Sequence, residues 1–126
     1  MTFTQSNVPT PAPFEAEATA DELQSRLNWG EPALTIIDVR DRNSFNKESI
    51  RGALSIPMSE LVSEAQANFE TMRDIYVYGN DDEETRLAAT SLREAGFDRV
   101  AELKGGLNGW KAIAAPVEGH TTTEYV

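Results

Sequence analysis

Strand-forming runs that alternate with helix-forming segments constrain this chain more than any other feature. The runs cover residues 34–39, 53–56, 75–78 and 100–103. The first reads Leu-Thr-Ile-Ile-Asp-Val and lacks the polar alternation of a half-exposed strand, so it is typical of a strand covered on both faces. Short links between such strands and the intervening helices predict an α/β fold with a mostly parallel sheet and helices on both faces.

Helix start and stop signals lie between the first runs. Thr19 and Glu22 have the spacing of a capping box, which predicts a helix over residues 20–28 that ends before Gly30. Ser59 is the expected N-cap of a helix that follows the second run, because a serine hydroxyl accepts hydrogen bonds from the first helical amides.

The second half of the chain carries the strongest helix pattern. Residues 82–95 place small and apolar side chains on one face, and Gly96 is the expected residue after the helix end. The pair Gly105-Gly106 predicts a tight turn after the last strand, because glycine accepts backbone conformations that other residues avoid. A short helix is expected to follow and to bury Trp110 in the core.

The chain length of 126 residues favours a single domain. Residues 1–13 contain Pro9, Pro11 and Pro13, which predicts a flexible, extended leader. Residues 118–126 show no helical period and are interpreted as a loose tail. The ordered domain is therefore expected over residues 14–117.

Composition excludes several classes of function. Acidic residues number 21 and basic residues 11, which gives a net charge of −10. This charge repels phosphate backbones and anionic lipids, so we expect neither a nucleic-acid nor a membrane partner, and it suits a basic protein partner. No cysteine is present, which excludes disulfides, thiolate metal sites and cysteine nucleophiles. No membrane-spanning run and no signal peptide are recognised, so a cytoplasmic protein is expected.

An ordered series of motifs fits the strand and helix ends. In chain order, the motifs are Asp38-Val39-Arg40, Phe45, Ile50-Arg51-Gly52-Ala53, Ile56-Pro57, Glu94-Ala95-Gly96-Phe97, Leu103-Lys104-Gly105-Gly106 and Trp110. Over residues 18–117 this series resembles a single-domain rhodanese. The resemblance implies a rhodanese-like fold with a five-stranded, mostly parallel sheet flanked by helices.

One departure from the family pattern decides the expected activity. In active rhodaneses the strand that matches residues 75–78 is followed at once by the catalytic cysteine, and here that position is Gly79. Thr85 has a hydroxyl but no histidine near it in sequence to act as a base. The only histidine is His120, and Ser49 stands where a histidine is often found in the family. We therefore expect no sulfur transfer through an enzyme persulfide, and no enzyme activity.

The candidate site is the acidic segment, defined as residues Gly79, Asn80, Asp81, Asp82, Glu83, Glu84, Thr85 and Arg86. Asp81 is a plausible N-cap with Glu84 three residues later, so the carboxylates fit the chemistry of a helix start. Two other interpretations stay open, an acidic recognition loop for a basic partner and a cation site. Asp38 and Arg40 lie at the end of a central strand, where they form either a structural ion pair or part of a ligand site.

Three hypotheses of function follow. The first is a non-catalytic rhodanese-like module with a protein-binding or regulatory role that uses residues 79–86. The second is a metal-dependent hydrolytic enzyme that uses Asp38 and the carboxylates of the acidic segment as ligands. The third is a docking accessory to an active sulfurtransferase. No cofactor is expected.

Overall fold

The computed structural model describes residues 14–30 and 33–119, which form an α/β fold around a five-stranded sheet. The strands lie in the order β1 (Glu17–Ala18), β6 (Val100–Leu103), β5 (Ile75–Tyr78), β2 (Thr35–Asp38) and β4 (Leu54–Ser55). Each neighbouring pair in this sheet is parallel. The predicted fold class is confirmed.

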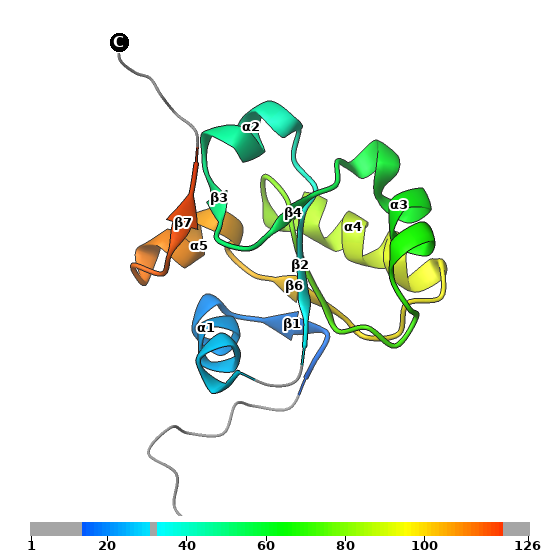
Figure 1. Ribbon diagram of the computed structural model, residues 1–126, viewed down its shortest axis with the longest axis horizontal. Helices are drawn as coiled ribbons and strands as arrows, with labels where there is room; N and C mark the ends of the chain where they lie inside the picture. The colour runs from blue at the N-terminus through cyan, green and yellow to red at the C-terminus, as the bar shows by residue number, and fades with distance from the viewer. Residues whose placement is uncertain (1–13, 31–32, 120–126) are drawn as a thin grey trace, which may run out of the picture.

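Helices cover both faces of the sheet (Figure 1). α1 (Ala20–Trp29) and α5 (Gly106–Ala112) pack on one face, and α3 (Leu61–Asn68) and α4 (Asp82–Glu94) pack on the other. Alternate residues of the central strands therefore enter different cores. Tyr78 and Trp110 are fully buried on the α1 side, whereas Val77 and Leu92 are fully buried on the α4 side.

The predicted helix signals at the first helix are confirmed. The Thr19 hydroxyl accepts a hydrogen bond from the Glu22 amide at 3.1 Å, and the Glu22 carboxylate accepts one from the Thr19 amide at 2.8 Å. Gly30 ends α1 in the left-handed conformation, with φ 89°. The glycine allows this backbone without the steric cost that a side chain would add.

Ser59 as a helix N-cap is wrong. Residues Met58–Glu60 form a short 3₁₀ helix, and α3 begins at Leu61 without a side-chain cap. The Met58 amide donates to the Val39 carbonyl at 3.2 Å and the Glu60 amide donates to the Pro57 carbonyl at 2.8 Å. Ser59 therefore lies inside the 3₁₀ turn, and Glu60 rather than Ser59 occupies the N-cap position of α3.

Three short features near the sheet ends were not predicted, and two predicted strands are shorter than expected. β1 is one of the three, and α2 (Arg42–Lys47) is another, capped by Asp41 through the Ser44 amide at 2.8 Å. The third is a small antiparallel sheet of β3 (Ser49–Ile50) and β7 (Val117–Glu118). The runs expected over 34–39 and 53–56 shorten to the bounds of β2 and β4.

The small sheet extends the ordered chain beyond the expected boundary at residue 117. The Pro116 carbonyl accepts hydrogen bonds from the Trp110 indole at 2.7 Å and from the Arg51 amide at 3.2 Å. Glu118, the first residue of the expected tail, lies in β7. The predicted leader 1–13 and most of the predicted tail lie outside the described residues. Among the residues described, no helix is long and apolar enough to span a membrane.

Candidate functional site

The acidic segment begins where two central strands end side by side. Asp38 of β2 pairs with Tyr78 of β5, and the Val39 amide donates to the Tyr78 carbonyl at 3.0 Å. The carboxyl ends of parallel strands are where α/β sheets place their ligand sites. The next residue after β5 is Gly79, so the fold puts this glycine at that sheet edge.

Gly79 is buried and held by its neighbours. Its amide donates to the Thr85 hydroxyl oxygen at 2.8 Å, and that hydroxyl donates to the Asp81 carbonyl at 3.0 Å. The Thr85 hydroxyl thus acts both as a hydrogen-bond acceptor and as a donor within the turn. Thr85 is only 1% exposed, so it is a structural residue of the turn rather than an accessible nucleophile.

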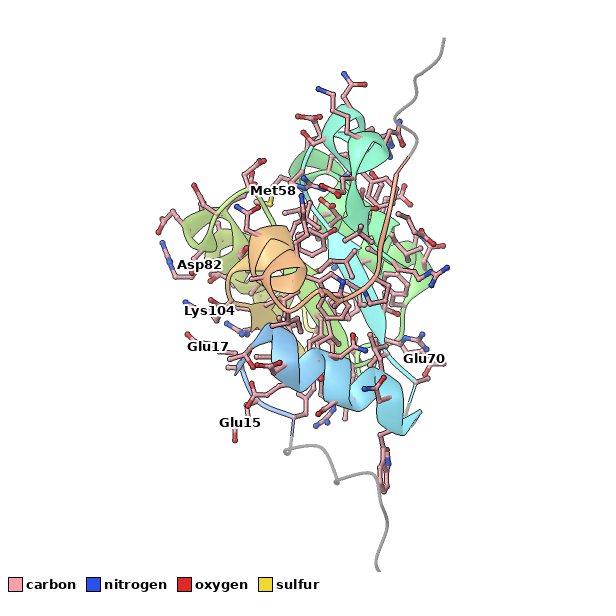
Figure 2. All side chains as sticks on the ribbon, turned by 90° about the vertical axis from the view of Figure 1, so that its left-hand side faces the viewer. Glu15, Glu17, Met58, Glu70, Asp82 and Lys104 are labelled. Atoms are coloured by element: carbon pink, nitrogen blue, oxygen red, sulfur yellow. The ribbon has the colours of Figure 1, made fainter. Side chains whose placement is uncertain are left out.

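Three of the four carboxylates in the acidic segment have partners in the first turns of α4 or in the turn after β6. Asp81 accepts a hydrogen bond from the Glu84 amide at 2.8 Å, which confirms it as the N-cap. Asp82 accepts one from the Gly105 amide at 2.9 Å and lies 3.9 Å from the Lys104 amine (Figure 2). Glu83 forms an exposed ion pair with Arg86 at 2.5 Å.

The fourth carboxylate points back into the turn. The Glu84 Oε1 accepts hydrogen bonds from the Asn80 amide at 2.7 Å and from the Asn80 side-chain nitrogen at 2.9 Å. A complete capping box would place this carboxylate on the amide of the N-cap, Asp81. The predicted pair is thus half right, because Glu84 reaches one residue further back.

Asp38 and Arg40 form a buried ion pair. Asp38 is fully buried, and both of its oxygens accept from the Arg40 guanidinium, with a shortest distance of 2.7 Å. Burial lowers the pKa of Arg40, but the hydrogen bonds and charge of Asp38 outweigh that effect and raise it. The guanidinium also donates to the Glu48 carbonyl at 2.7 Å. The pair therefore ties the segment after α2 to the sheet.

Tyr78 completes this buried network. Its hydroxyl oxygen accepts a hydrogen bond from the Ile50 amide at 3.0 Å, and its ring lies 5.7 Å from the centre of the Arg40 guanidinium. Burial, and then the negative charge of Asp38, raise the pKa of Tyr78 far above that of a free tyrosine. The hydroxyl therefore stays protonated at neutral pH. The predicted structural role of Asp38 and Arg40 fits this geometry.

The structure does not gather the predicted metal ligands. Asp38 faces Arg40 on the α1 side of the sheet. The carboxylates of the acidic segment have other partners, which lie in the turn before α4, in the first turns of α4 and in the turn after β6. Among residues 14–30 and 33–119, no group of three or more histidine, aspartate or glutamate side chains is arranged to hold a metal.

The contact between Gly79 and the turn after β6 was not predicted from the sequence. Gly105 and Gly106 were assigned to a tight turn, and both have positive φ values of 83° and 51°. Gly106 also lies against Gly79, because a β-carbon at 106 would stand 3.4 Å from the Gly79 carbonyl oxygen. The available signal was that both glycine positions follow strands that end at the same sheet edge.

Comparison with known proteins places this site in a family. The family model of the rhodanese-like domain matches residues 19–113, which include the whole acidic segment. The chain belongs to the rhodanese-like family. The resemblance expected from the motifs is therefore confirmed, and the family member described here has no cysteine in its sequence.

Relatives in the family include proteins named as enzymes. GlpE of Coxiella burnetii, a thiosulfate sulfurtransferase, is 34% identical over 79 residues, which cover 63% of this chain and 73% of GlpE. The uncharacterized protein YqhL of Bacillus subtilis is 35% identical over 75 residues, which cover 60% of this chain. This chain spans only 59% of YqhL.

A solved structure supports the fold directly. The crystal structure of the Alr3790 protein from Anabaena superimposes with a TM-score of 0.79 and 55% sequence identity. The match covers 81% of this chain and 91% of that chain.

Proposed function

We propose that this protein is a non-catalytic rhodanese-like module that binds another protein through the acidic segment. The observation that carries the proposal is Gly79 at the position after β5 in a chain without cysteine. Persulfide transfer needs a thiolate that attacks the donor sulfur, and neither glycine nor the internally bonded Thr85 hydroxyl supplies one.

The chemistry of the surface indicates a basic partner. Asp81, Asp82 and Glu83 are exposed at the mouth of the turn, and the whole chain carries a net charge of −10. Each of these carboxylates keeps acceptor capacity beyond its internal hydrogen bond. A field of this sign steers a positively charged surface toward the site and makes the association sensitive to salt. We expect this association in the cytoplasm.

An active sulfurtransferase is one candidate partner. The support is that GlpE, a relative from the same family, is named a thiosulfate sulfurtransferase. A domain that keeps the fold without the thiol suits a docking accessory to such an enzyme. The alternative of metal-dependent hydrolysis has no comparable support, because the ligands predicted for it face different partners.

The test compares partners recovered from native cytosol by wild type and by a triple variant. The variant Asp81→Asn/Asp82→Asn/Glu83→Gln removes three negative charges while each amide keeps an oxygen that accepts hydrogen bonds. Asparagine remains a good N-cap, so α4 is expected to stay intact. We expect partners that bind wild type at low salt to be lost from the triple variant.

A matched control removes the same charge elsewhere. Glu15, Glu70 and Asp98 are exposed and precede β1, β5 and β6, whereas the acidic segment follows β5. Figure 2 shows Glu15 and Glu70 away from Asp82. The variant Glu15→Gln/Glu70→Gln/Asp98→Asn is expected to keep the wild-type partners. If both triple variants lose the same partners, or neither loses any, the acidic segment is not the binding face.

A further inference from the structure

The Glu84 side chain occupies the inside of the turn that it belongs to. Its carboxylate accepts hydrogen bonds from the main-chain nitrogen of Asn80 at 2.7 Å and from the side-chain nitrogen at 2.9 Å. The side chains of Asp81 to Glu83 are exposed. The Glu84 carboxylate, which belongs to the same turn, thus accepts the hydrogen bond of the Asn80 main-chain N–H. Such an amide at a helix start is the kind of group that an anion from solution would otherwise use.

The same side chain fills the space next to Gly79. A β-carbon at position 79 would stand 2.6 Å from Glu84 Oε1, 2.9 Å from its Cγ and 3.1 Å from its Cβ. The three nearest atoms therefore all belong to one residue. Gly79 is not among the glycines with positive φ, so its backbone accepts an L side chain and the obstacle is space.

We propose that the Glu84 side chain closes the turn from the position it takes beside Gly79, so that any side chain at position 79 displaces it. A side chain at 79 forces Glu84 to rotate outward and to give up both Asn80 hydrogen bonds. Glycine at position 79 and the present position of the Glu84 side chain are thus coupled, and a larger residue fits at position 79 without displacing Glu84 only when Glu84 also changes. This holds whether or not the acidic segment binds a partner.

A cycle of variants tests the coupling by thermal unfolding. Gly79→Ala is made in the wild-type, Glu84→Gln and Glu84→Ala backgrounds, and the melting temperature is measured for each pair. Glutamine keeps the shape and the acceptor oxygen of glutamate but removes the charge, so it separates occupied space from electrostatic effects. In the Glu84→Ala background a contact with the Cβ of residue 84 remains at 3.1 Å and needs only a small adjustment.

We expect Gly79→Ala to lower the melting temperature by about 4 °C or more in the first two backgrounds. In the Glu84→Ala background it is expected to have little effect or to stabilise, since alanine restricts the unfolded chain more than glycine. An equal loss in all three backgrounds would overturn the proposal. A loss that disappears with Glu84→Gln would also overturn it, because charge rather than space would then be the obstacle.

A second measurement keeps glycine at position 79 and does not depend on a strained variant. Hydrogen exchange of the Asn80 amide is compared between wild type, Glu84→Gln and Glu84→Ala. We expect about tenfold faster exchange in Glu84→Ala, which corresponds to about 1.4 kcal/mol of lost protection, and wild-type exchange in Glu84→Gln. The Gly79 amide, bonded to Thr85, is the internal control. Unchanged Asn80 exchange in Glu84→Ala would contradict the proposal.

Discussion

At the scale of single residues, the site combines a buried network with a glycine directly after β5. Asp38 and Arg40 form an ion pair, and the Arg40 guanidinium also lies over the Tyr78 ring. The pair and the tyrosine hydroxyl are further tied to the backbone at Glu48 and Ile50, as parts of the scaffold. Position 79 beside them carries no side chain. The residues that hold the fold and the residue that would react are therefore separate, so the reactive group can be absent while the scaffold persists.

Restoring the thiol by Gly79→Cys is expected to restore little thiosulfate:cyanide sulfurtransferase activity. Turnover needs the introduced thiolate to attack the outer sulfur of thiosulfate and release sulfite, after which cyanide removes that sulfur as thiocyanate. Glu84 fills the space, and each nearby carboxylate disfavours the anionic donor by about 1 kcal/mol. Thiocyanate formation is the measurement, with GlpE of Coxiella burnetii as positive control. We expect Gly79→Cys/Glu84→Ala to exceed the single variant, and GlpE-like turnover in the single variant would contradict this interpretation.

Breaking the buried ion pair is expected to destabilise the domain strongly. Asp38→Ala leaves the Arg40 guanidinium, whose side chain is 11% exposed, without its carboxylate partner. The expected loss is about 3 kcal/mol in the free energy of unfolding, measured by urea denaturation. Arg42→Ala, which breaks the exposed pair with Glu60, is the control and is expected to change little. Equal effects of the two variants would show that the buried pair has no special role.

The raised pKa of Tyr78 predicts a loss of stability in alkaline solution. In the folded protein burial and Asp38 keep the phenol protonated, whereas in the unfolded chain it ionises near pH 10. The contribution is therefore complete below about pH 10 and declines above it, by up to about 1.4 kcal/mol per pH unit. Urea denaturation from pH 8 to 11 measures the slope. Tyr78→Phe is expected to be less stable throughout, because the Ile50 amide loses its acceptor, and to show a shallower alkaline decline. The same alkaline decline in stability in wild type and Tyr78→Phe would contradict this prediction.

At the scale of elements, one local contact and one long-range contact hold the start of α4. Asp81 caps the helix, and Asp82 joins its first turn to Gly105 in the turn after β6. Two loops that are distant in sequence thus hold each other at the same sheet edge. The carboxylates of the acidic segment therefore stabilise the local structure, apart from any role in binding.

Removing the cap is expected to weaken α4 without abolishing the fold. Asp81→Ala leaves the Glu84 amide without its acceptor, and such losses cost about 1 kcal/mol. Thermal or urea unfolding measures the effect. Asp81→Ser, which can still accept the hydrogen bond, is the matched control and is expected to stay near wild type. A serine variant as unstable as the alanine variant would show that charge, rather than capping, is what Asp81 supplies.

The sequence predicted those elements whose signals are local. The Thr19 and Glu22 capping box, the Gly30 stop and the Asp81 cap all depend on residues within a few positions of one another. The two-residue strands β1, β3 and β7 were not predicted, since each exists only through a partner far along the chain. The inward turn of Glu84 was missed for a related reason, because spacing alone does not decide whether it bonds to Asn80 or Asp81.

At the scale of the whole molecule, fold and charge lead to different expectations. The rhodanese-like fold is shared with relatives named as sulfurtransferases, while this chain has a net charge of −10 and no cysteine. A fold sets where a site lies, and the side chains present there decide what it does. The proposed role in recognition follows from the side chains at the site rather than from the fold.

Thiocyanate formation by the wild-type protein, supplied with thiosulfate and cyanide, tests this proposal most directly. Because no residue can carry a persulfide at position 79, we expect a rate equal to that of buffer at every protein concentration, while GlpE of Coxiella burnetii turns over in the same assay. A rate that rises in proportion to the concentration of the wild-type protein would contradict the proposal that this domain recognises a partner without reacting.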